Sequence, residues 1–504
     1  MSALLNGMKE TTNFGYTENG ATKHLSTLDK VLDLFAMGGA YRNRVEHDIK
    51  TLFGDAYRQD PTLATKCLFY LRDVRGGQGE RKFFRWGYHW LMWNAPTKDT
   101  ALKNLNLIPE FGRWDDLIWV WWEAPEGEIK DTAFEIIREQ LAIDVVSNTP
   151  SLLGKWMPSE NASSYQTKEK AKALTKALGW TPKIYRQVLS GLRKKINVLE
   201  RLMSANEWDK IEFDKIPSKA GMKYRNAFAV KEVTAARYKA FMENKETKVN
   251  AGVLNPVDIV DKIINAKGPY WNIDYSFFNE VEINTLQKYW DNLKDYYQGR
   301  EENAIAIVDV SGSMSGTPMA AAIGMGAYVA QKSHGPFANH FITFSSNPQL
   351  VEFEGDDIVD KVLRCQKAGW GMNTDVERAM DLILNTAIRN KLSQDDLPAR
   401  LYIFSDMEFD SAVRISRWDE DADQQRLTLF EGIEKKWNRA GYKMPKVTFW
   451  NLQARTRNIP AIGDSFNYIS GFSMSQMEAV MAGKSAIDMM LDVLNGERYE
   501  AVTA

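Results

Sequence analysis

The hydrophobic residues change their spacing once along the chain, near residue 300. Before that point they recur mostly at helical spacing, and short connectors containing Gly or Pro separate the helical segments. We expect helices in segments such as Tyr41–Tyr57, Pro61–Arg72, Glu80–Trp93, Asp115–Trp122 and Asp131–Val146. Antiparallel helices with short connectors form layered arrays. Because no fixed repeat length is present, an irregular, HEAT-like α-helical stack is favoured over a regular solenoid.

After residue 300, short apolar runs alternate with helical segments, which is the pattern of a doubly wound α/β sheet. The expected strands are Ala304–Val310, His340–Phe344, Gln349–Phe353, Arg400–Ser405, Lys446–Leu452 and Ser465–Ser470. The expected helices are Pro318–Gln331, Ile358–Cys365, Val376–Asn390, Gln425–Ala440 and Ser473–Leu494. The pattern therefore predicts a multidomain chain, with an N-terminal arm at 1–24, a helical domain at 25–298 and an α/β domain at 299–504.

One buried strand leads directly into a loop of small, oxygen-bearing residues. Asp309, Ser311 and Ser313 follow one another at alternate positions after the apolar run 305–308. Thr374 precedes a later helix, and Asp406 follows the strand Arg400–Ser405. Open α/β sheets place their ligand sites at the carboxyl ends of the strands, and oxygen ligands select hard cations. These five residues predict a site for magnesium, with calcium or manganese as alternatives.

In the structural alternative, Ser311 and Ser313 cap a helix and Asp406 ends a strand in a turn. A cap needs only one oxygen, whereas five side chains with oxygen atoms converge on the expected rim, so the metal site is favoured. Asp375 and Asp410 are placed outside the metal-binding set. The first is positioned to cap its own helix, and the second fits a solvated loop.

The composition of the chain bears on its core size, its charged partners and its location in the cell. The 504 residues are 44% hydrophobic and carry a net charge of -2, enough apolar surface for several sizeable cores. Residues 301–504 hold 28 acidic and 20 basic side chains, and residues 1–300 hold 38 and 44, so a polyanion would prefer the first half. Two cysteines, no leader pattern and no apolar run of 18 residues predict a cytoplasmic protein without membrane contact.

The densest basic segment spans residues 164–197, where nine cations face one acid, Glu169, among several aromatic residues. Such a segment is the best candidate in this sequence for contacting RNA phosphates. Its cations are Lys168, Lys170, Lys172, Lys176, Lys183, Arg186, Arg193, Lys194 and Lys195. For any single lysine the alternative is an ordinary solvated helix face.

Sixteen tryptophans are present, and seven of them crowd residues 86–122. We expect these rings to fill interfaces between helices rather than to form a stacking platform for bases. The seven are Trp86, Trp90, Trp93, Trp114, Trp119, Trp121 and Trp122.

The order Asp-x-Ser-x-Ser, Thr, Asp at strand-to-helix junctions is similar to the metal-ion-dependent adhesion site (MIDAS) of the von Willebrand factor A fold. Residues 303 to about 496 resemble that fold. A helical half followed by such a domain resembles the Ro autoantigen (TROVE) architecture, and it resembles more closely a set of uncharacterised phage and cellular proteins. The resemblance to the Ro family is carried by Arg75–Arg81 and Ile108–Leu117. The resemblance to the uncharacterised set is carried by Asn19–Thr22, Lys155–Glu160 and Phe404–Phe409.

The resemblance to the Ro family implies a stack or ring of paired helices closed by the A domain. It also implies a ribonucleoprotein component that binds structured small RNA and single-stranded RNA ends. The alternative is a metal-dependent protein interaction or assembly module without RNA, in which the ion attracts an acidic group of a protein ligand. A phage-encoded member would act in the host cytoplasm.

A catalytic role such as a magnesium-dependent nuclease fits the sequence less well. Hydroxyls dominate the expected metal shell, and no dense carboxylate cluster supports a two-metal site. None of the five histidines has a recognisable catalytic spacing. We therefore expect a noncatalytic protein.

Overall fold

The computed structural model describes residue 9 and residues 12–266, 273–344, 347–367, 375–410 and 427–504. Its contacts divide the chain into two compact units. The sheet unit comprises Met1–Asp60 and Lys248–Gly496, and the helical unit comprises Pro61–Thr247 and Glu497–Ala504. Residues 25–60 and 248–298, which the sequence analysis grouped with the helical domain, lie in the same compact unit as the sheet.

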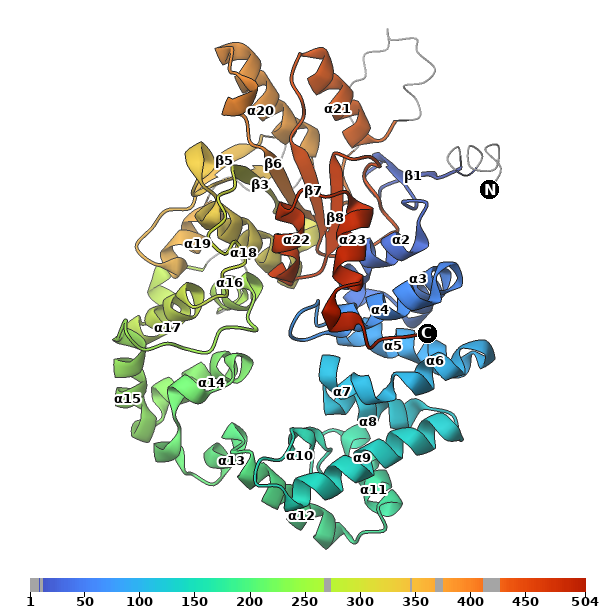
Figure 1. Cartoon of the computed structure of the whole chain (residues 1–504). Helices are drawn as coiled ribbons and strands as arrows, with labels where there is room; N and C mark the ends of the chain where they lie inside the picture. The colour runs from blue at the N-terminus through green and yellow to red at the C-terminus, as the bar shows by residue number, and fades with distance from the viewer. Residues whose placement is uncertain (1–8, 10–11, 267–272, 345–346, 368–374, 411–426) are drawn as a thin grey trace. The chain divides into compact units, whose positions relative to one another are not determined.

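A six-stranded sheet forms the centre of the sheet unit (Figure 1). Its strands are β3 (Ala304–Asp309), β4 (His340–Phe344), β5 (Gln349–Glu352), β6 (Arg400–Ser405), β7 (Lys446–Asn451) and β8 (Phe466–Ser470). The order is β5-β4-β3-β6-β7-β8, and all neighbours are parallel except the antiparallel pair β4 and β5. The α/β prediction is confirmed, and each strand end lies within one residue of its expected position. Both central strands, β3 and β6, are buried at every residue, which explains their apolar sequences.

Helix α18 (Thr317–Lys332) packs against β3, β4 and β6. Its residues 318–330 are all buried, because α16 (Pro256–Ile264) also packs against it. The close approach to β3 depends on Gly326, where an added Cβ would lie 2.3 Å from Cγ2 of Val308. This glycine therefore sets how near the helix lies to the strand that ends at Asp309.

Other helices of the sheet unit come from residues 25–60, from residues 248–298 and from the α/β segment after residue 300. They are α2 (Lys30–Met37), α3 (Glu46–Gln59), α17 (Glu280–Asp291), α19 (Ile358–Lys367), α20 (Val376–Asn390), α21 (Leu429–Arg439), α22 (Met477–Met481) and α23 (Ala486–Leu494). Helix α2 contacts β8 and α23, and α17 contacts α19. These contacts explain why residues 25–60 and 248–298 join the sheet in one compact unit.

Two expected helices are interrupted. The segment Tyr41–Tyr57 is not one helix, because a 3-10 helix ends at Asn43 and α3 begins at Glu46 after an extended Val45. The segment Ser473–Leu494 divides because Gly483 adopts φ 72° after α22. The side chain of Ser485 then accepts from the backbone N–H of Asp488 and starts α23.

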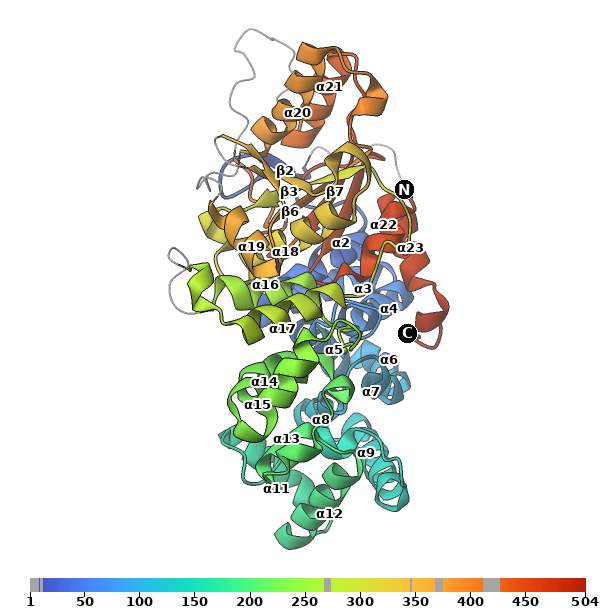
Figure 2. The same ribbon diagram turned by 90° about the vertical axis from the view of Figure 1, so that its left-hand side faces the viewer.

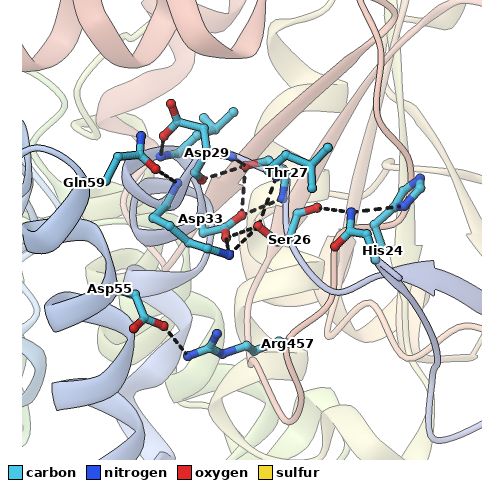
Figure 3. Close-up of polar contacts among 12 residues, drawn as sticks. His24, Ser26, Thr27, Asp29, Asp33, Asp55, Gln59 and Arg457 are labelled. Atoms are coloured by element: carbon cyan, nitrogen blue, oxygen red, sulfur yellow. Dashed lines mark hydrogen bonds and ion pairs between the residues drawn. The ribbon is translucent and has the colours of Figure 1, made fainter. Parts of the chain in front are cut away.

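The described part of the N-terminal arm is a hairpin of β1 (Phe14–Tyr16) and β2 (Thr22–His24). A polar network follows it, in which the backbone N–H and hydroxyl of Thr27 both donate to Oδ1 of Asp33, at 2.6 and 2.8 Å (Figure 3). Nearby, Arg457 pairs with Asp55 of α3 at 3.3 Å. These contacts help to hold residues 27–60 within the sheet unit.

The helical unit contains α4 (Pro61–Arg72), α5 (Arg81–Trp93), α6 (Lys98–Lys103), α7 (Ile108–Phe111), α8 (Trp114–Glu123), α9 (Glu128–Val146), α10 (Leu153–Trp156), α11 (Tyr165–Ala177), α12 (Pro182–Lys195), α13 (Leu199–Ser204), α14 (Ser218–Val230) and α15 (Glu232–Glu243). Consecutive helices pack in pairs, such as α4 with α5, α8 with α9, and α14 with α15 (Figure 2). The helical character expected of this region is confirmed. Within the described ranges, no helix combines the length and the apolar character needed to cross a membrane.

Candidate metal centre

The two central strands end side by side at one edge of the sheet. Val308 of β3 pairs with Phe404 of β6 in parallel register. The direction of strand succession reverses between β3 and β6, which is the switch point where doubly wound sheets open a ligand crevice. The loops that carry Asp309 and Asp406 therefore meet at this edge.

Asp309 lies at the bottom of the site and is completely buried. Its Oδ1 accepts from the backbone N–H of Ser311 at 2.9 Å, and its Oδ2 accepts from the hydroxyl of Ser405 at 2.6 Å. The hydroxyls of Ser311 and Ser313 lie 2.9 Å apart. One carboxylate and two hydroxyls from a single loop are thus brought together.

The hydroxyls are not used as helix caps. Ser311 precedes a 3-10 helix at Gly312–Met314, but its side chain makes no capping hydrogen bond. The residue before α18 is Gly316, which has no side chain to cap with. The capping alternative raised by the sequence does not account for the two serines.

Asp406 supplies a second buried carboxylate. Its Oδ1 accepts from the backbone N–H of Glu408 at 3.1 Å. Its Oδ2 is buried and accepts no hydrogen bond from any described residue, and the nearest cation is Nε of Arg455 at 3.6 Å. A buried carboxylate oxygen without a donor is an unfavourable state that a bound cation would relieve.

The electrostatics of this edge also favour a cation. Burial, together with the nearby charge of Asp406, raises the pKa of Asp309 to about 7. Burial raises the pKa of Asp406 as well, although the Ser313 hydroxyl, the Glu408 N–H and the Arg455 guanidinium act in the opposite direction. The protein groups around these two neighbouring carboxylates therefore do not fully offset their burial and mutual repulsion, and a bound cation would stabilise their ionised forms.

The available donors are oxygen atoms, which suits magnesium, calcium or manganese. Across the described residues, no group of three carboxylate, imidazole or thiol side chains is arranged to hold a metal. Among the described residues, the serine hydroxyls would therefore supply the further ligands of an ion at this edge. Thr374, the remaining member of the expected set, lies outside the described residues. Asp375 caps α20 by accepting from the backbone N–H of Arg378 at 3.1 Å, in agreement with its exclusion from the set.

Arg455 was not found by sequence reasoning, although it borders the site. Its guanidinium pairs with Glu18 at 2.9 Å and donates to the backbone oxygen of Ser313 at 3.2 Å. Glu18 belongs to the turn of the N-terminal hairpin. Its backbone N–H donates to the side-chain Oε2 of the buried Glu408 at 2.8 Å. No local pattern signals these contacts, because they join residues far apart in the sequence.

The hairpin turn is fastened to the segment after β6 by further hydrogen bonds. The hydroxyl of Thr17 donates to the backbone oxygen of Phe409 at 2.6 Å, and the side-chain amide of Asn19 donates to the backbone oxygen of Glu408 at 2.7 Å. Met407 in this segment adopts φ 64°, a left-handed conformation that is strained for a non-glycine residue. The hairpin thus supports the loop that positions Asp406.

The nine expected RNA-contacting cations lie on α11 and α12, but they are not equally available. Arg193 donates to the backbone oxygens of Gly154 and Met157, and Lys195 donates to that of Val145. Lys172 forms an ion pair with Glu169, and Arg186 forms one with Glu160. Lys170 lies over the ring of Trp122. Among the described residues, the four whose side chains make none of these contacts are Lys168, Lys176, Lys183 and Lys194.

The tryptophans of residues 86–122 serve more than one purpose. Trp119 and Trp121 are buried, at 8% and 6% exposure, and Trp86 meets Trp119 edge-on with centroids 5.8 Å apart. These rings fill helix interfaces as expected. Trp93 and Trp122 remain exposed, at 54% and 37%.

Comparison with known proteins gives two family matches. A family model described as a domain of unknown function, DUF2828, matches residues 17–142 and 149–298. A second, described as a domain of unknown function, DUF7788, matches residues 303–501. A protein of Acanthamoeba polyphaga mimivirus, described as Uncharacterized protein L728, is 29% identical over 96% of this chain and 87% of its own length. These descriptions state no activity, so a functional interpretation depends on the chemistry of the site.

Proposed function

The chain belongs to the family described as a domain of unknown function, DUF2828, whose model matches more than half of it, and we propose that it is a noncatalytic, divalent-metal-binding protein. In this proposal the sheet unit is a von Willebrand factor A-like domain with a metal-ion-dependent adhesion site. The helical unit is Ro-like and binds RNA, as part of a cytoplasmic ribonucleoprotein.

One observation carries the metal proposal. Two buried carboxylates, Asp309 and Asp406, lie at the switch point of the sheet with two serine hydroxyls that cap no helix. One oxygen of Asp406 accepts no hydrogen bond from any described residue. Magnesium is the favoured ion, with calcium or manganese as alternatives. Ser311, Ser313 and Thr374 would hold it, with Asp309 and Asp406 contributing directly or through water.

A magnesium ion held mainly by neutral hydroxyls keeps net positive charge and attracts an acidic group of a partner. The chain's own residues prepare for this by excluding water around Asp309 and by fixing the serine loop through the Ser311 N–H. Arg455 adds a second positive charge at the same rim. An acidic protein ligand therefore fits this edge better than a neutral or basic one.

Calorimetric titration with magnesium tests the metal site. Asp309→Asn keeps the side-chain size but removes the charge, and we expect it to abolish detectable binding while the protein stays folded. Asp375→Asn is the matched control, because asparagine caps a helix as well as aspartate does. Equal magnesium affinity in the wild type and in Asp309→Asn would refute the assignment.

The RNA part of the proposal is supported by Lys176, Lys183 and Lys194 of α11 and α12, which are exposed and have no ion pair to another described residue. Sequencing the nucleic acid that copurifies with the full chain tests it directly. A reproducible RNA class supports a ribonucleoprotein component. Recovery of a protein partner without nucleic acid supports the alternative, a metal-dependent interaction or assembly module.

A further inference from the structure

Five helices of the helical unit bring cations and tryptophans together at one place. We call this group the arginine–tryptophan cluster; it comes from the end of α4, from α5, from α8 with the residue before it, and from α10 and α11. Its members are Arg72, Arg81, Arg85, Arg113, Lys155, Lys170, Trp119, Trp122 and Trp156. Only Lys170 also belongs to the basic segment selected from the sequence.

The base of the cluster is an ion network. Asp116 is fully buried and is held by Arg72 at 2.7 Å and by Arg85 at 3.0 Å. The neighbouring Asp115 pairs with Arg85 at 3.1 Å and with Arg81 at 3.4 Å. Three arginines thus share two carboxylates, and the network fixes the arginines of α4 and α5 against the start of α8.

A cation lies over each of the three tryptophan rings of the cluster. Arg113 lies 4.7 Å from the ring centroid of Trp156, and Lys155 lies 5.8 Å from the same centroid. Lys170 lies 5.8 Å from the centroid of Trp122. Arg85 lies 5.6 Å from the third ring, that of Trp119. Positive charge and aromatic surface therefore occur together, in a geometry that favours cation–π attraction.

The cluster has more positive than negative charge. Six cations face three carboxylates, those of Asp115, Asp116 and Glu123. Burial and the nearby Arg72 and Arg81 lower the pKa of Arg113. Burial and Arg85 lower the pKa of Lys170. Cations held this close repel one another, so an anionic ligand would relieve an existing cost.

Part of the cluster is open to a ligand. The side chain of Arg81 is 42% exposed, and Trp122 is 37% exposed. Lys155 and Trp156 are half-buried. Phosphates require cations, and unpaired bases require aromatic surface on which to stack, whereas a duplex conceals its base faces.

We propose that the arginine–tryptophan cluster binds single-stranded nucleic acid. Arg81, Arg113, Lys155 and Lys170 contact phosphates, and bases stack on Trp122 and Trp156. This inference rests on the proposed RNA binding of the helical unit and deepens it by naming the residues that bind the single strand.

Fluorescence anisotropy of the full chain with labelled oligonucleotides tests the site. The probes are a 12-nucleotide oligo(U) RNA, the equivalent oligo(dT) DNA and an RNA duplex, and the comparison of the first two separates RNA from DNA. Arg81→Gln/Lys155→Gln/Lys170→Gln removes three charges, and Lys98→Gln/Lys210→Gln/Lys245→Gln removes three exposed charges outside the cluster.

For the cluster variant we expect weaker binding of the single strand and a plot of log affinity against log salt that is flatter by about 2, because each phosphate contact contributes about 0.7. The control variant should bind nearly as the wild type does. Trp122→Leu should weaken binding about 5- to 150-fold with an unchanged salt slope, because stacking carries no charge. These single-strand effects should exceed those on the duplex.

Crosslinking of 4-thiouridine RNA to the wild-type chain keeps the inference testable if a variant misfolds. Crosslinked peptides from α5, α8, α10 or the start of α11 support it. Wild-type RNA binding that persists in both cluster variants, or crosslinks confined to other helices, overturns this site and leaves the proposed RNA binding standing. Absence of binding to either single-stranded probe by the wild type overturns both, and magnesium titration still tests the metal site separately.

Discussion

Arg455 places a positive charge 3.6 Å from Oδ2 of Asp406. This charge competes with a metal ion for the same carboxylate. We expect Arg455→Gln to strengthen magnesium binding about 1.4- to fivefold, because a partly exposed charge pair contributes about 0.2–1 kcal/mol. Calorimetry measures the change. Arg457→Gln, whose native partner is Asp55 at 3.3 Å, is the control and should leave magnesium affinity unaltered.

The raised pKa of Asp309, about 7, makes the metal site dependent on pH. An unfolded aspartate has a pKa of about 3.9, so in the metal-free protein this group favours folding most at low pH. That contribution is lost as the pH rises through about 7, and bound magnesium reverses the effect because it requires the carboxylate.

We therefore expect magnesium affinity about tenfold weaker at pH 6 than at pH 8, since each pH unit below the pKa of a ligand costs a factor of ten. Thermal unfolding with and without magnesium gives the same information, with a larger magnesium-induced rise in Tm at pH 8. An affinity that is constant or falls between pH 6 and pH 8 would contradict the role of Asp309.

Sequence reasoning placed Asp309, Ser311, Ser313 and Asp406 together because each follows a buried strand of one parallel sheet. The carboxyl ends of neighbouring parallel strands must meet at one edge, so order along the chain was sufficient. Arg455 could not be predicted in this way, because its position depends on the tertiary packing of the loop after β7 and not on a sequence motif.

At the level of elements, the distance between α18 and β3 depends on Gly326. An added methyl group would overlap Cγ2 of Val308, one residue before Asp309. We expect Gly326→Ala to destabilise the protein by about 1–3 kcal/mol, the usual cost of overpacking a core. Gly432→Ala in α21 meets no atom within 4 Å and should instead stabilise by up to about 1 kcal/mol.

Urea unfolding of the two glycine variants provides the comparison. Equal effects at positions 326 and 432 would mean that helix propensity alone decides, and that close packing on β3 does not matter. If α18 positions the site, Gly326→Ala should also weaken magnesium binding, whereas Gly432→Ala should not.

The strands were predicted within one residue because apolar runs bounded by polar loops have few alternatives. Helix interruptions were harder to predict from periodicity. In residues 473–494 the apolar spacing continues through Gly483, and only its positive φ ends α22. The N-terminal hairpin was missed because strands of three residues are too short to produce a periodic signal.

At the level of the whole molecule, the compact units are not consecutive segments of the sequence. The change of hydrophobic period near residue 300 marks where strands begin, but it does not determine which helices pack with them. Helices α2 and α16 bury their apolar faces against β8 and α18, so they join the sheet unit. Periodicity identifies an apolar face without identifying what covers it.

The central claim is that this chain holds a hard divalent ion at the edge where β3 and β6 end. Anomalous diffraction from crystals of the full chain grown with manganese tests it most directly. We expect one strong anomalous peak within about 2.5 Å of the hydroxyl oxygens of Ser311 and Ser313, and no peak there in Asp309→Asn crystals. A wild-type map without a peak at this edge, or with the ion bound only elsewhere, would contradict the account.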